Sequence, residues 1–211
     1  MFGFNMMRFG PSKFFDPFGD KTPGYGPGPT GTAPGDPNAT HATKGNDKLI
    51  FGKGDQNANG DNGNDILIGG SGDDTLRGGN GSDFVFGGSG DDDLRGGYDQ
   101  DFLNGGTGDD LINGGRGDDV MIGGPGDDVF VFDGVWGEAS GNDVILGFKT
   151  SDDSLLIRNV DTVTVSQAKG GVLLEMSSGG SLKLYGVSAD DIDESLFVGH
   201  APEIVYSDAA F

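Results

Sequence analysis

The sequence contains no cysteine and only two histidines, His41 and His200. A disulfide framework and thiol catalysis are therefore excluded, and the HExxH zinc motif of metalloproteases cannot be built. The GxSxG turn that carries the nucleophile of lipases is also missing. Paired carboxylates are abundant and would suit a glycosidase, but their nine-residue spacing fits a metal ladder better. We therefore predict that the chain is not an enzyme.

Basic residues and long hydrophobic runs are also scarce. Lys and Arg number 13 against 34 Asp and Glu, which gives a net charge of -21. This charge repels phosphate, so no nucleic-acid partner is expected, whereas a cation is a fitting ligand. No apolar run approaches the roughly 18 residues of a membrane span, and residues 1–10 do not resemble a cleaved signal peptide. Composition alone leaves a disordered acidic chain open as the alternative.

Composition divides the chain into three zones. Residues 1–41 are rich in Gly, Pro and Phe and are predicted to form a flexible, irregular tail. Residues 42–131 form an internal repeat. Residues 132–211 show apolar alternation, which predicts a β-rich cap with short strands at 143–148, 154–157, 163–165, 172–176 and 181–185. Ser188 is expected to cap a brief helical turn.

The repeat has a period of nine and fills ten rows, from ATKGNDKLI at 42–50 to GGPGDDVFV at 123–131. Position 6 of the row is Asp in every row except the second, which has Gln56. Position 4 is Gly in every row except the seventh, which has Asp99, and position 8 is apolar throughout. Ten consecutive rows in register indicate a solenoid. Asp55–Gly60 also matches half of an EF-hand loop, but Ile66 stands where that loop needs Glu.

The rows resemble the RTX (hemolysin-type) family, whose GGxGxDxUx nonapeptide is a calcium-binding β-helix signature. The resemblance covers 90 of the 211 residues. It implies an all-β fold, a parallel β-roll in which each nonapeptide supplies a six-residue turn and a short strand, and two nonapeptides complete one coil.

The C-terminal zone is similar to the C-terminal region of serralysin-type metalloproteases and related type I secretion substrates. The shared features are FVFD, GNDVILGF, LYGVSADDI, SLF and the terminal DAAF. The resemblance implies an uncleaved C-terminal secretion signal read by an ABC transporter, and a secreted, extracellular or cell-surface location.

Calcium takes 6–8 oxygen ligands from carboxylates and carbonyls. Glycine lets a turn bring its carbonyls inward, and the Asp at position 6 supplies charge. By the family resemblance, an ion lies between each turn and the turn two rows later. The earlier turn offers the carbonyls of positions 2 and 4 and its Asp. The later turn offers the carbonyls of positions 1 and 3 and its own Asp.

Ten rows allow eight such pairs of turns, so up to about eight Ca²⁺ ions are expected. Four pairs match best: Gly70, Gly72 and Asp74 with Gly87, Ser89 and Asp92; Gly79, Gly81 and Asp83 with Gly96, Tyr98 and Asp101; Gly88, Gly90 and Asp92 with Gly105, Thr107 and Asp110; Gly106, Gly108 and Asp110 with Gly123, Pro125 and Asp128. The other predicted ligands are Asp47, Asp65, Gly114, Arg116 and Asp119.

Three positions depart from the pattern. The pair that uses Gln56 is expected to be weak or empty. Asp99 must adopt a glycine-like conformation, which Asp tolerates better than most residues. The repeat calls for glycine at position 61, where the sequence has Asp61, and no metal ligand is expected from that residue.

Position 8 is expected to point inward, so positions 7 and 9 point outward. Alternate rows then give two unlike outer faces. One is largely polar and includes Asn57, Thr75, Asp93, Leu111, Asn59, Arg77, Arg95 and Asn113. The other, here called the apolar face, consists of Ile50, Ile66, Ile68, Phe84, Phe86, Phe102, Val120 and Ile122. Such a surface rarely stays bare on a monomer; the phenylalanines of the tail, the C-terminal zone or a second copy of the chain are candidate covers.

Two functions fit these features. In the first, the chain is a secreted calcium-binding protein with a structural or adhesion role, and its roll folds on binding calcium outside the cell. In the second, it is a secretion and folding module that acts with a separate exported partner. An accessory module of a carbohydrate-active enzyme is a third interpretation.

Overall fold

The computed structural model describes residues 40–134, 141–199 and 201–207, all of which belong to one compact unit, Gly35–Phe211. Most of the predicted tail, residues 1–39, lies outside the described residues. The described part is built from strands and two short 3-10 turns. Within it, none of the helices is long and apolar enough to cross a membrane.

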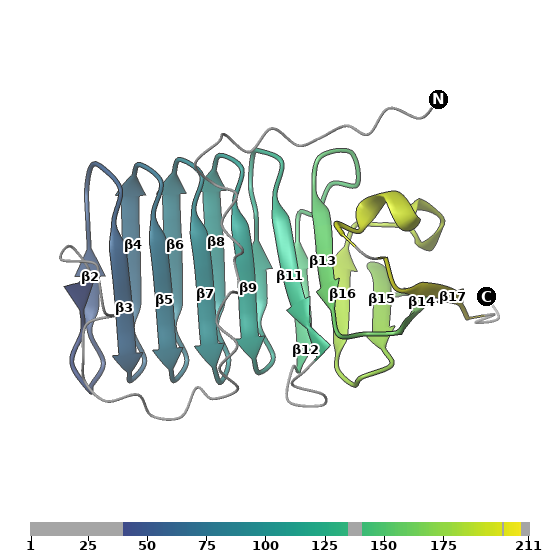
Figure 1. The fold of residues 1–211 in the computed structure, drawn as a ribbon, viewed down its shortest axis with the longest axis horizontal. Helices are drawn as coiled ribbons and strands as arrows, with labels where there is room; N and C mark the ends of the chain where they lie inside the picture. Colours follow the sequence, from purple (N-terminus) through teal and green to yellow (C-terminus); the bar gives the residue numbers. More distant parts are fainter. Residues whose placement is uncertain (1–39, 135–140, 200, 208–211) are drawn as a thin grey trace. The chain divides into compact units, whose positions relative to one another are not determined.

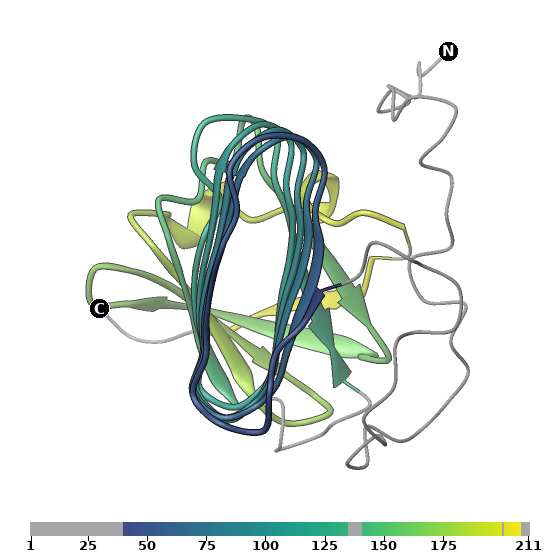
Figure 2. The ribbon, with the colours of Figure 1, turned by 90° about the vertical axis from the view of Figure 1, so that its left-hand side faces the viewer.

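The repeat region forms a flattened parallel coil in which successive strands alternate between two sheets (Figures 1 and 2). Its strands are β1 Thr40–His41, β2 Lys48–Ile50, β3 Asn57–Asn62, β4 Ile66–Ser71, β5 Thr75–Asn80, β6 Phe84–Ser89, β7 Asp93–Tyr98, β8 Phe102–Thr107, β9 Leu111–Arg116, β10 Val120–Ile122 and β11 Val129–Asp133. Each row pairs with the rows two places before and after it, as Val85 does with Leu67 and Leu103. The parallel β-roll with two nonapeptides per coil is thus confirmed.

The strands are longer than the resemblance implies. Each full strand covers positions 7–9 of one row and positions 1–3 of the next, which leaves a turn of three residues at positions 4–6. Pairing continues into the glycine run because Gly70 and Ser71 are in register with Gly88 and Ser89. Glycine lacks a side chain but keeps both backbone hydrogen-bonding groups, so it can extend a ladder that local propensity does not favour.

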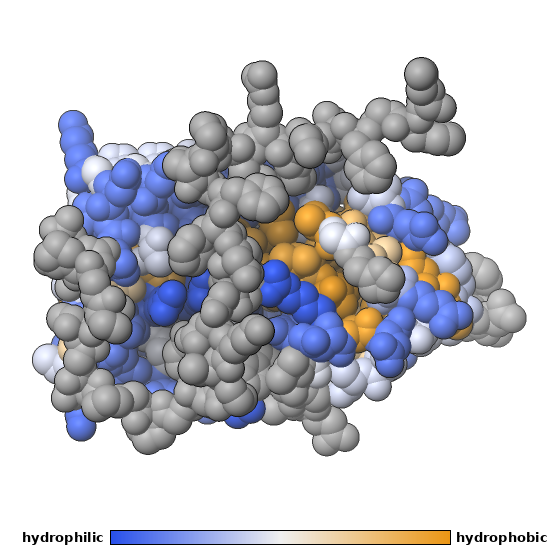
Figure 3. Space-filling view, in the orientation of Figure 1, coloured by the Kyte–Doolittle hydropathy of each residue, from blue (hydrophilic) through white to orange (hydrophobic). Residues whose placement is uncertain are grey.

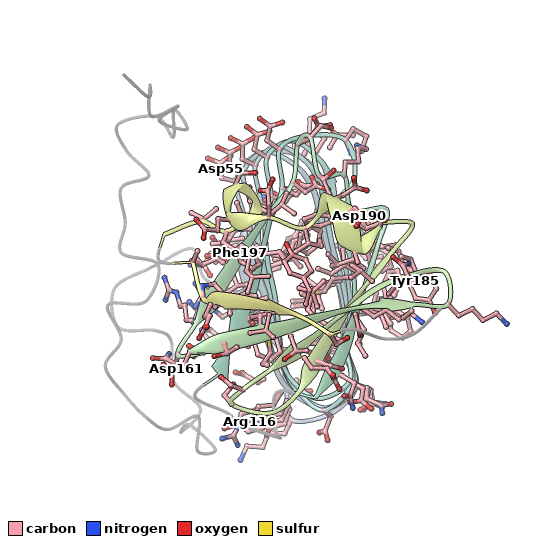
Figure 4. All side chains as sticks on the ribbon, turned by 90° about the vertical axis from the view of Figure 1, so that its right-hand side faces the viewer. Asp55, Arg116, Asp161, Tyr185, Asp190 and Phe197 are labelled. Atoms are coloured by element: carbon pink, nitrogen blue, oxygen red, sulfur yellow. The ribbon has the colours of Figure 1, made fainter. Side chains whose placement is uncertain are left out.

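A single column of apolar side chains fills the interior of the coil, as the nine-residue pattern predicts. The side chains at position 8 from Ala58 to Phe130 are at most 2% exposed, and only Leu49, in the first row, is partly buried. Figure 4 shows these side chains filling the space between the two sheets. One apolar residue per row is a thin core, so the coil needs a further source of stability.

The coil continues beyond the tenth row. Strand β12 (Asn142–Leu146) pairs in parallel with β10, and β13 (Ser154–Arg158) pairs in parallel with β11. Next to β12 lie β16 (Ser181–Tyr185), β15 (Gly171–Met176), β14 (Thr162–Ala168) and β17 (Glu203–Tyr206), with antiparallel pairing on both sides of β15. Ser188 caps η2 (Ala189–Asp191), as expected, and η3 (Glu194–Leu196) follows. The five strands predicted in this zone are confirmed.

The two outer faces differ as the row parity predicts. The apolar face lies on the ten-stranded sheet, where Ile50 is 58% and Phe84 50% exposed and the Phe102 ring packs against those of Phe84 and Phe86. The other sheet carries the ion pair between Arg95 and Asp93. In the view of Figure 3, hydrophobic residues gather toward the C-terminal end of the molecule. The cover expected from the tail lies outside the described residues, apart from residues 40 and 41.

Candidate metal sites between the turns

Turns of odd-numbered rows lie at one edge of the coil and those of even-numbered rows at the other, as the labelled Asp55 and Arg116 show in Figure 4. At each edge the Asp residues at position 6 form a buried ladder. From Asp65 on, the Oδ1 atom of each accepts the backbone N–H of the position-6 residue two rows earlier: Asp83 from Asp65 at 2.7 Å, and Asp92 from Asp74 at 2.7 Å. We call each contact between such a pair of turns a rung.

Among the described residues, the second oxygen of most of these carboxylates finds no hydrogen-bond partner. Eight buried Oδ2 atoms are in this state, those of Asp65, Asp74, Asp83, Asp92, Asp101, Asp110, Asp119 and Asp128. Leaving a buried charged acceptor without a partner is costly. Because this cost recurs at eight positions along the coil, each of these oxygens is a candidate ligand for a cation.

Glycine at position 1 keeps the space around each Oδ2 atom open. A Cβ on Gly69 would fall 2.0 Å from Oδ2 of Asp74 and 2.7 Å from the carbonyl oxygen of Gly87. A Cβ on Gly87 would likewise meet Oδ2 of Asp92 and the carbonyl of Gly105. The carboxylate of one turn and the position-1 carbonyl of the turn two rows later therefore converge on the same small space.

Positive φ angles at positions 2 and 4 aim the remaining carbonyls along the stack. Gly70 has φ 111° and Gly72 has φ 119°, and a Cβ on Gly88 would lie 2.2 Å from the Gly70 oxygen. At position 3, the Ser89 carbonyl faces back and accepts the Gly72 N–H at 2.8 Å. Asp99 adopts φ 72°, so the predicted tolerance of Asp at a glycine position is confirmed. The six residues expected for this rung are thus brought together.

Residue 61, from which no ligand is predicted, has the backbone geometry of the other turns. The residue is Asp61 rather than the glycine of the repeat, yet it adopts φ 67°, in the same left-handed region as Gly70. A Cβ on Gly79 would lie 2.3 Å from the Asp61 carbonyl oxygen, so this oxygen faces the next turn just as that of Gly70 does. The Asp61 side chain turns aside toward His41, with Oδ2 3.5 Å from Nδ1. The backbone carbonyl of Asp61 is therefore a candidate ligand at the rung that begins at Asp65.

The other predicted rungs repeat this arrangement. Asp83, Asp92 and Asp110 donate their N–H groups to the next Asp on their edge, at 2.8, 2.8 and 3.0 Å. The position-3 carbonyls of Thr107 and Pro125 accept the N–H groups of Gly90 and Gly108, and the position-1 carbonyl of Gly123 accepts that of Gly106. The carbonyls of Gly96 and Gly114 lie beside the Oδ2 atoms of Asp83 and Asp101. The Arg116 guanidinium lies over the ring of Tyr98 at 5.1 Å, so only the backbone of these two residues would face an ion.

Hard-cation chemistry suits this donor set. In the described part of the chain, no group of three His, Cys, Asp or Glu side chains could hold a metal. Each rung has two carboxylates, so a bound ion would take most of its ligands from backbone carbonyls. Calcium accepts such all-oxygen sites, whereas zinc prefers nitrogen and sulfur.

The first rung at each edge is built differently. Oδ2 of Asp47 accepts the N–H and the hydroxyl of Thr43 at 2.8 and 2.7 Å, so it is already satisfied. The Gln56 side chain donates its amide to the Gly54 carbonyl at 2.9 Å, which places a donor where the other rungs present oxygen. Both first rungs are therefore poorer cation sites than those that follow.

Sequence reasoning missed two parts of the ladders. Asn or Asp side chains at position 5 form a second, exposed ladder in the opposite direction: Asp73 accepts the N–H of Asp91 at 3.0 Å. Asp143 and Asp153 extend the position-6 ladders by accepting the N–H groups of Asp119 and Asp128. The motif Gly141-Asn142-Asp143 carried the signal, because it reproduces positions 4–6 of a row after an insertion of six residues.

Burial raises the pKa of every ladder carboxyl from Asp65 to Asp153, and their backbone hydrogen bonds offset this only in part. The pKa reaches about 9 for Asp101 and Asp143, about 7 for Asp83, Asp110 and Asp119, and about 6 for Asp92 and Asp128. Neighbouring carboxylates add to the shift. Without a counter-ion, the charged form of these groups opposes the folded state.

Metal-free protein is therefore expected to lose stability as the pH rises from about 5 to about 9. Folded-state pKa values above the ordinary 3.8 mean that the folded chain holds protons more tightly than the unfolded chain. That contribution is complete below about pH 4 and is lost as the pH passes through the folded values. Thermal melts of metal-stripped protein at pH 5, 7 and 9 measure it; a melting temperature that rises with pH contradicts it.

Asp101→Asn isolates one carboxyl, because the amide keeps the acceptor oxygen for the Asp83 N–H and removes the charge. In metal-free protein it should move the pH at which the coil unfolds to a higher value and change Tm little at pH 5. The exposed Asp127→Asn is the matched control and should show no such difference.

The sequence profile described as RTX calcium-binding nonapeptide repeat (4 copies) matches residues 59–94 and 95–130. No curated protein matches the chain. Several solved structures resemble it, among them two at 18% sequence identity. The extracellular lipase LipA from Serratia marcescens has a TM-score of 0.37, with 77% of this chain and 40% of the lipase covered. The AlgE6R3 subunit of the Azotobacter vinelandii mannuronan C5-epimerase has a TM-score of 0.30, with 74% of this chain and 80% of the subunit covered.

The chain thus spans less than half the length of the lipase. The profile match rests on the same rows whose Asp and Gly residues build the rungs. Residues 59–130 thus carry RTX calcium-binding nonapeptide repeats.

Proposed function

We propose that the chain is a calcium-binding protein whose coil takes up Ca²⁺ between successive turns at both edges and folds as it does so. The observation that carries the proposal is the row of eight buried Oδ2 atoms without a hydrogen-bond partner. A divalent ion at a rung would stabilise the charged form of the carboxylates there, which burial otherwise disfavours.

Six rungs within the ten rows have both an unpartnered Oδ2 atom and the turn geometry on each side; they begin at Asp65, Asp74, Asp83, Asp92, Asp101 and Asp110. We assign calcium to these six. The rungs that begin at Asp47 and Gln56 are left out because Thr43 and the Gln56 amide occupy their oxygens.

We further propose that the protein acts outside the cell in a structural or adhesion role without catalysis. The C-terminal similarity to type I secretion substrates supports export through an ABC transporter, with residues 132–211 as cap and signal. Extracellular calcium is abundant enough to fill sites of modest affinity. The half-exposed Phe84 supports a contact on the apolar face, for which a second copy of the chain is the candidate partner.

Calcium stoichiometry tests the proposal. Metal-stripped protein in equilibrium dialysis should bind about six Ca²⁺ ions, and magnesium should not displace them because it demands tighter octahedral geometry. Asp92 takes part in two rungs, so Asp92→Asn should remove at least two ions. Asp127→Asn, an exposed residue on the same edge, should remove none. Absence of binding at millimolar calcium, or equal competition by magnesium, would falsify the assignment.

A further inference from the structure

The even-row edge ends in a turn that differs from all those before it. Residues 148–153 connect β12 to β13 and occupy the place of a twelfth row, because β13 pairs with β11 and Oδ1 of Asp153 accepts the Asp128 N–H at 3.3 Å. The last rung of this edge thus lies between the turn of Asp128 and the turn of Asp153. Both carboxylates are buried.

The turn at 148–153 does not present its carbonyls as the other turns do. Lys149 and Ser151 stand at positions 2 and 4, and neither has the positive φ that those positions adopt in rows 3 to 10. The Lys149 carbonyl accepts the N–H groups of Asp152 and Asp153, at 3.1 and 2.7 Å. Because φ at positions 2 and 4 sets the direction of the peptide groups before them, the carbonyls of positions 1 and 3 are not aimed as calcium ligands.

The side chain of a lysine reaches this rung, while Oδ2 of Asp128 keeps no hydrogen-bond partner among the described residues. The ammonium of Lys149 donates to the carbonyl oxygen of Gly124 at 3.1 Å, the position-2 carbonyl of the tenth row. The backbone N–H of the same residue donates to Oδ2 of Asp153 at 2.7 Å. Among the buried ladder carboxyls of the described residues, only those of Asp128 and Asp153 have a lysine among the charges that act on their pKa.

We propose that the Lys149 ammonium serves as the cation of this last rung. The rung then binds no metal ion, and the hydrogen bonds between its two turns stay formed when calcium is scarce. The proposal rests on calcium filling the six rungs assigned above. A compact ammonium with three donors can serve a carbonyl and nearby carboxylates as a small cation does. The junction between the coil and the C-terminal strands is then fixed before any calcium arrives, and the neighbouring rung has a formed surface to bind against.

Amide hydrogen exchange on the full chain tests the proposal. Equivalent backbone N–H groups form hydrogen bonds between the two turns at a calcium rung and at the lysine rung, so their protection can be compared directly. Asp92 and Leu111 donate across a calcium rung, to Oδ1 of Asp110 and to the Asp92 carbonyl. Asp128 and Ser154 donate across the lysine rung in the same way. Lowering calcium from about 100 times Kd to zero should cut protection of the first pair about a hundredfold, and of the second pair less than about tenfold.

Lys149→Met should lower protection of Asp128 and Ser154 at least about tenfold at every calcium level, in line with the loss of a charged hydrogen bond. Lys169→Met removes the same charge from the exposed β14–β15 turn and should have no such effect. Lys149→Arg, which keeps the charge, should retain most of the protection. Equal protection in Lys149→Met and Lys169→Met contradicts the role of the ammonium.

If Lys149→Met does not fold, the calcium dependence of amide protection in the wild type still tests the proposal. If Asp128 and Ser154 lose protection on the same calcium curve as Asp92 and Leu111, Lys149 does not replace the ion. Anomalous scattering from calcium-loaded crystals gives a second criterion: an ion between Asp128 and Asp153 overturns the proposal. If instead Asp92 and Leu111 do not respond to calcium, it is the proposed function that fails.

Discussion

Stripping calcium from the protein at pH 8 is expected to unfold the coil from β2 to β9. The repeat holds 18 Asp against 6 Lys and Arg, a net charge of -12, and its Asp residues lie in closely spaced ladders. Their mutual repulsion opposes folding, and one apolar residue per row offers little to balance it. At ten times Kd each site contributes roughly 1.4 kcal/mol. Six sites then contribute about 8 kcal/mol, as much as the whole stability of an ordinary domain.

Circular dichroism during a calcium titration measures this effect. The β signal should be small in excess chelator and rise steeply as calcium is added, with magnesium a poor substitute. A residual signal from the C-terminal strands, which have a conventional core around Val163, Leu174 and Leu184, is expected at all calcium levels. A complete β signal in excess chelator would show that calcium does not drive folding.

Gly87→Ala is expected to be among the most damaging single substitutions, although it adds only one methyl group. Gly87 has no positive φ, so its backbone would accept alanine. The added Cβ would lie 2.1 Å from Oδ2 of Asp92 and 2.7 Å from the Gly105 carbonyl, the two oxygens assigned to one ion. Asp92 cannot move away freely because its Oδ1 atom holds the Asp74 N–H. We expect a loss of about 2–4 kcal/mol and of one bound calcium.

Gly52→Ala is the matched control, since no atom lies within 4 Å of its added Cβ. Thermal melts at saturating calcium should place Gly87→Ala about 5–15 °C below the wild type and Gly52→Ala close to it. If the two variants have the same Tm and bind the same number of calcium ions, the carboxylate and the carbonyl beside Gly87 do not share one ion site.

The sequence predicts the architecture well because a short and exact repeat allows few ways of stacking the rows. Once every second row is stacked, the inward column at position 8 and the two unlike outer faces follow from side-chain alternation. The φ angle of Asp99 follows from its place at a glycine position. The same argument applies to Asp61, whose positive φ also follows from its place at a glycine position. The ligand assignments at the rungs agree with the geometry and stay predictions until an ion is measured.

The parts that were missed are those where the period breaks or where residue type does not reveal the role. Six extra residues before Asp143, and Lys149 and Ser151 in place of glycines, hide the last two turns from a search for the repeat. The bond from Asp91 to Asp73 depends on which way an exposed side chain leans along the stack. The hydrogen bonding of Gly70 and Ser71 into the ladder depends on the neighbouring coil, so local propensity misplaces the strand ends.

Each strand bonds only to the strands two rows before and after it. The coil can therefore be shortened in the middle without changing the structure at either end. Excising two whole rows from the middle, such as residues 79–96, rejoins a turn to an equivalent turn and shortens each sheet by one strand spacing, about 4.8 Å. Excising a single row would instead exchange the two faces on one side of the cut and set Phe84 and Phe86 in line with polar residues. If both faces are to stay continuous, rows can therefore be added or removed only in pairs, that is, one whole coil at a time.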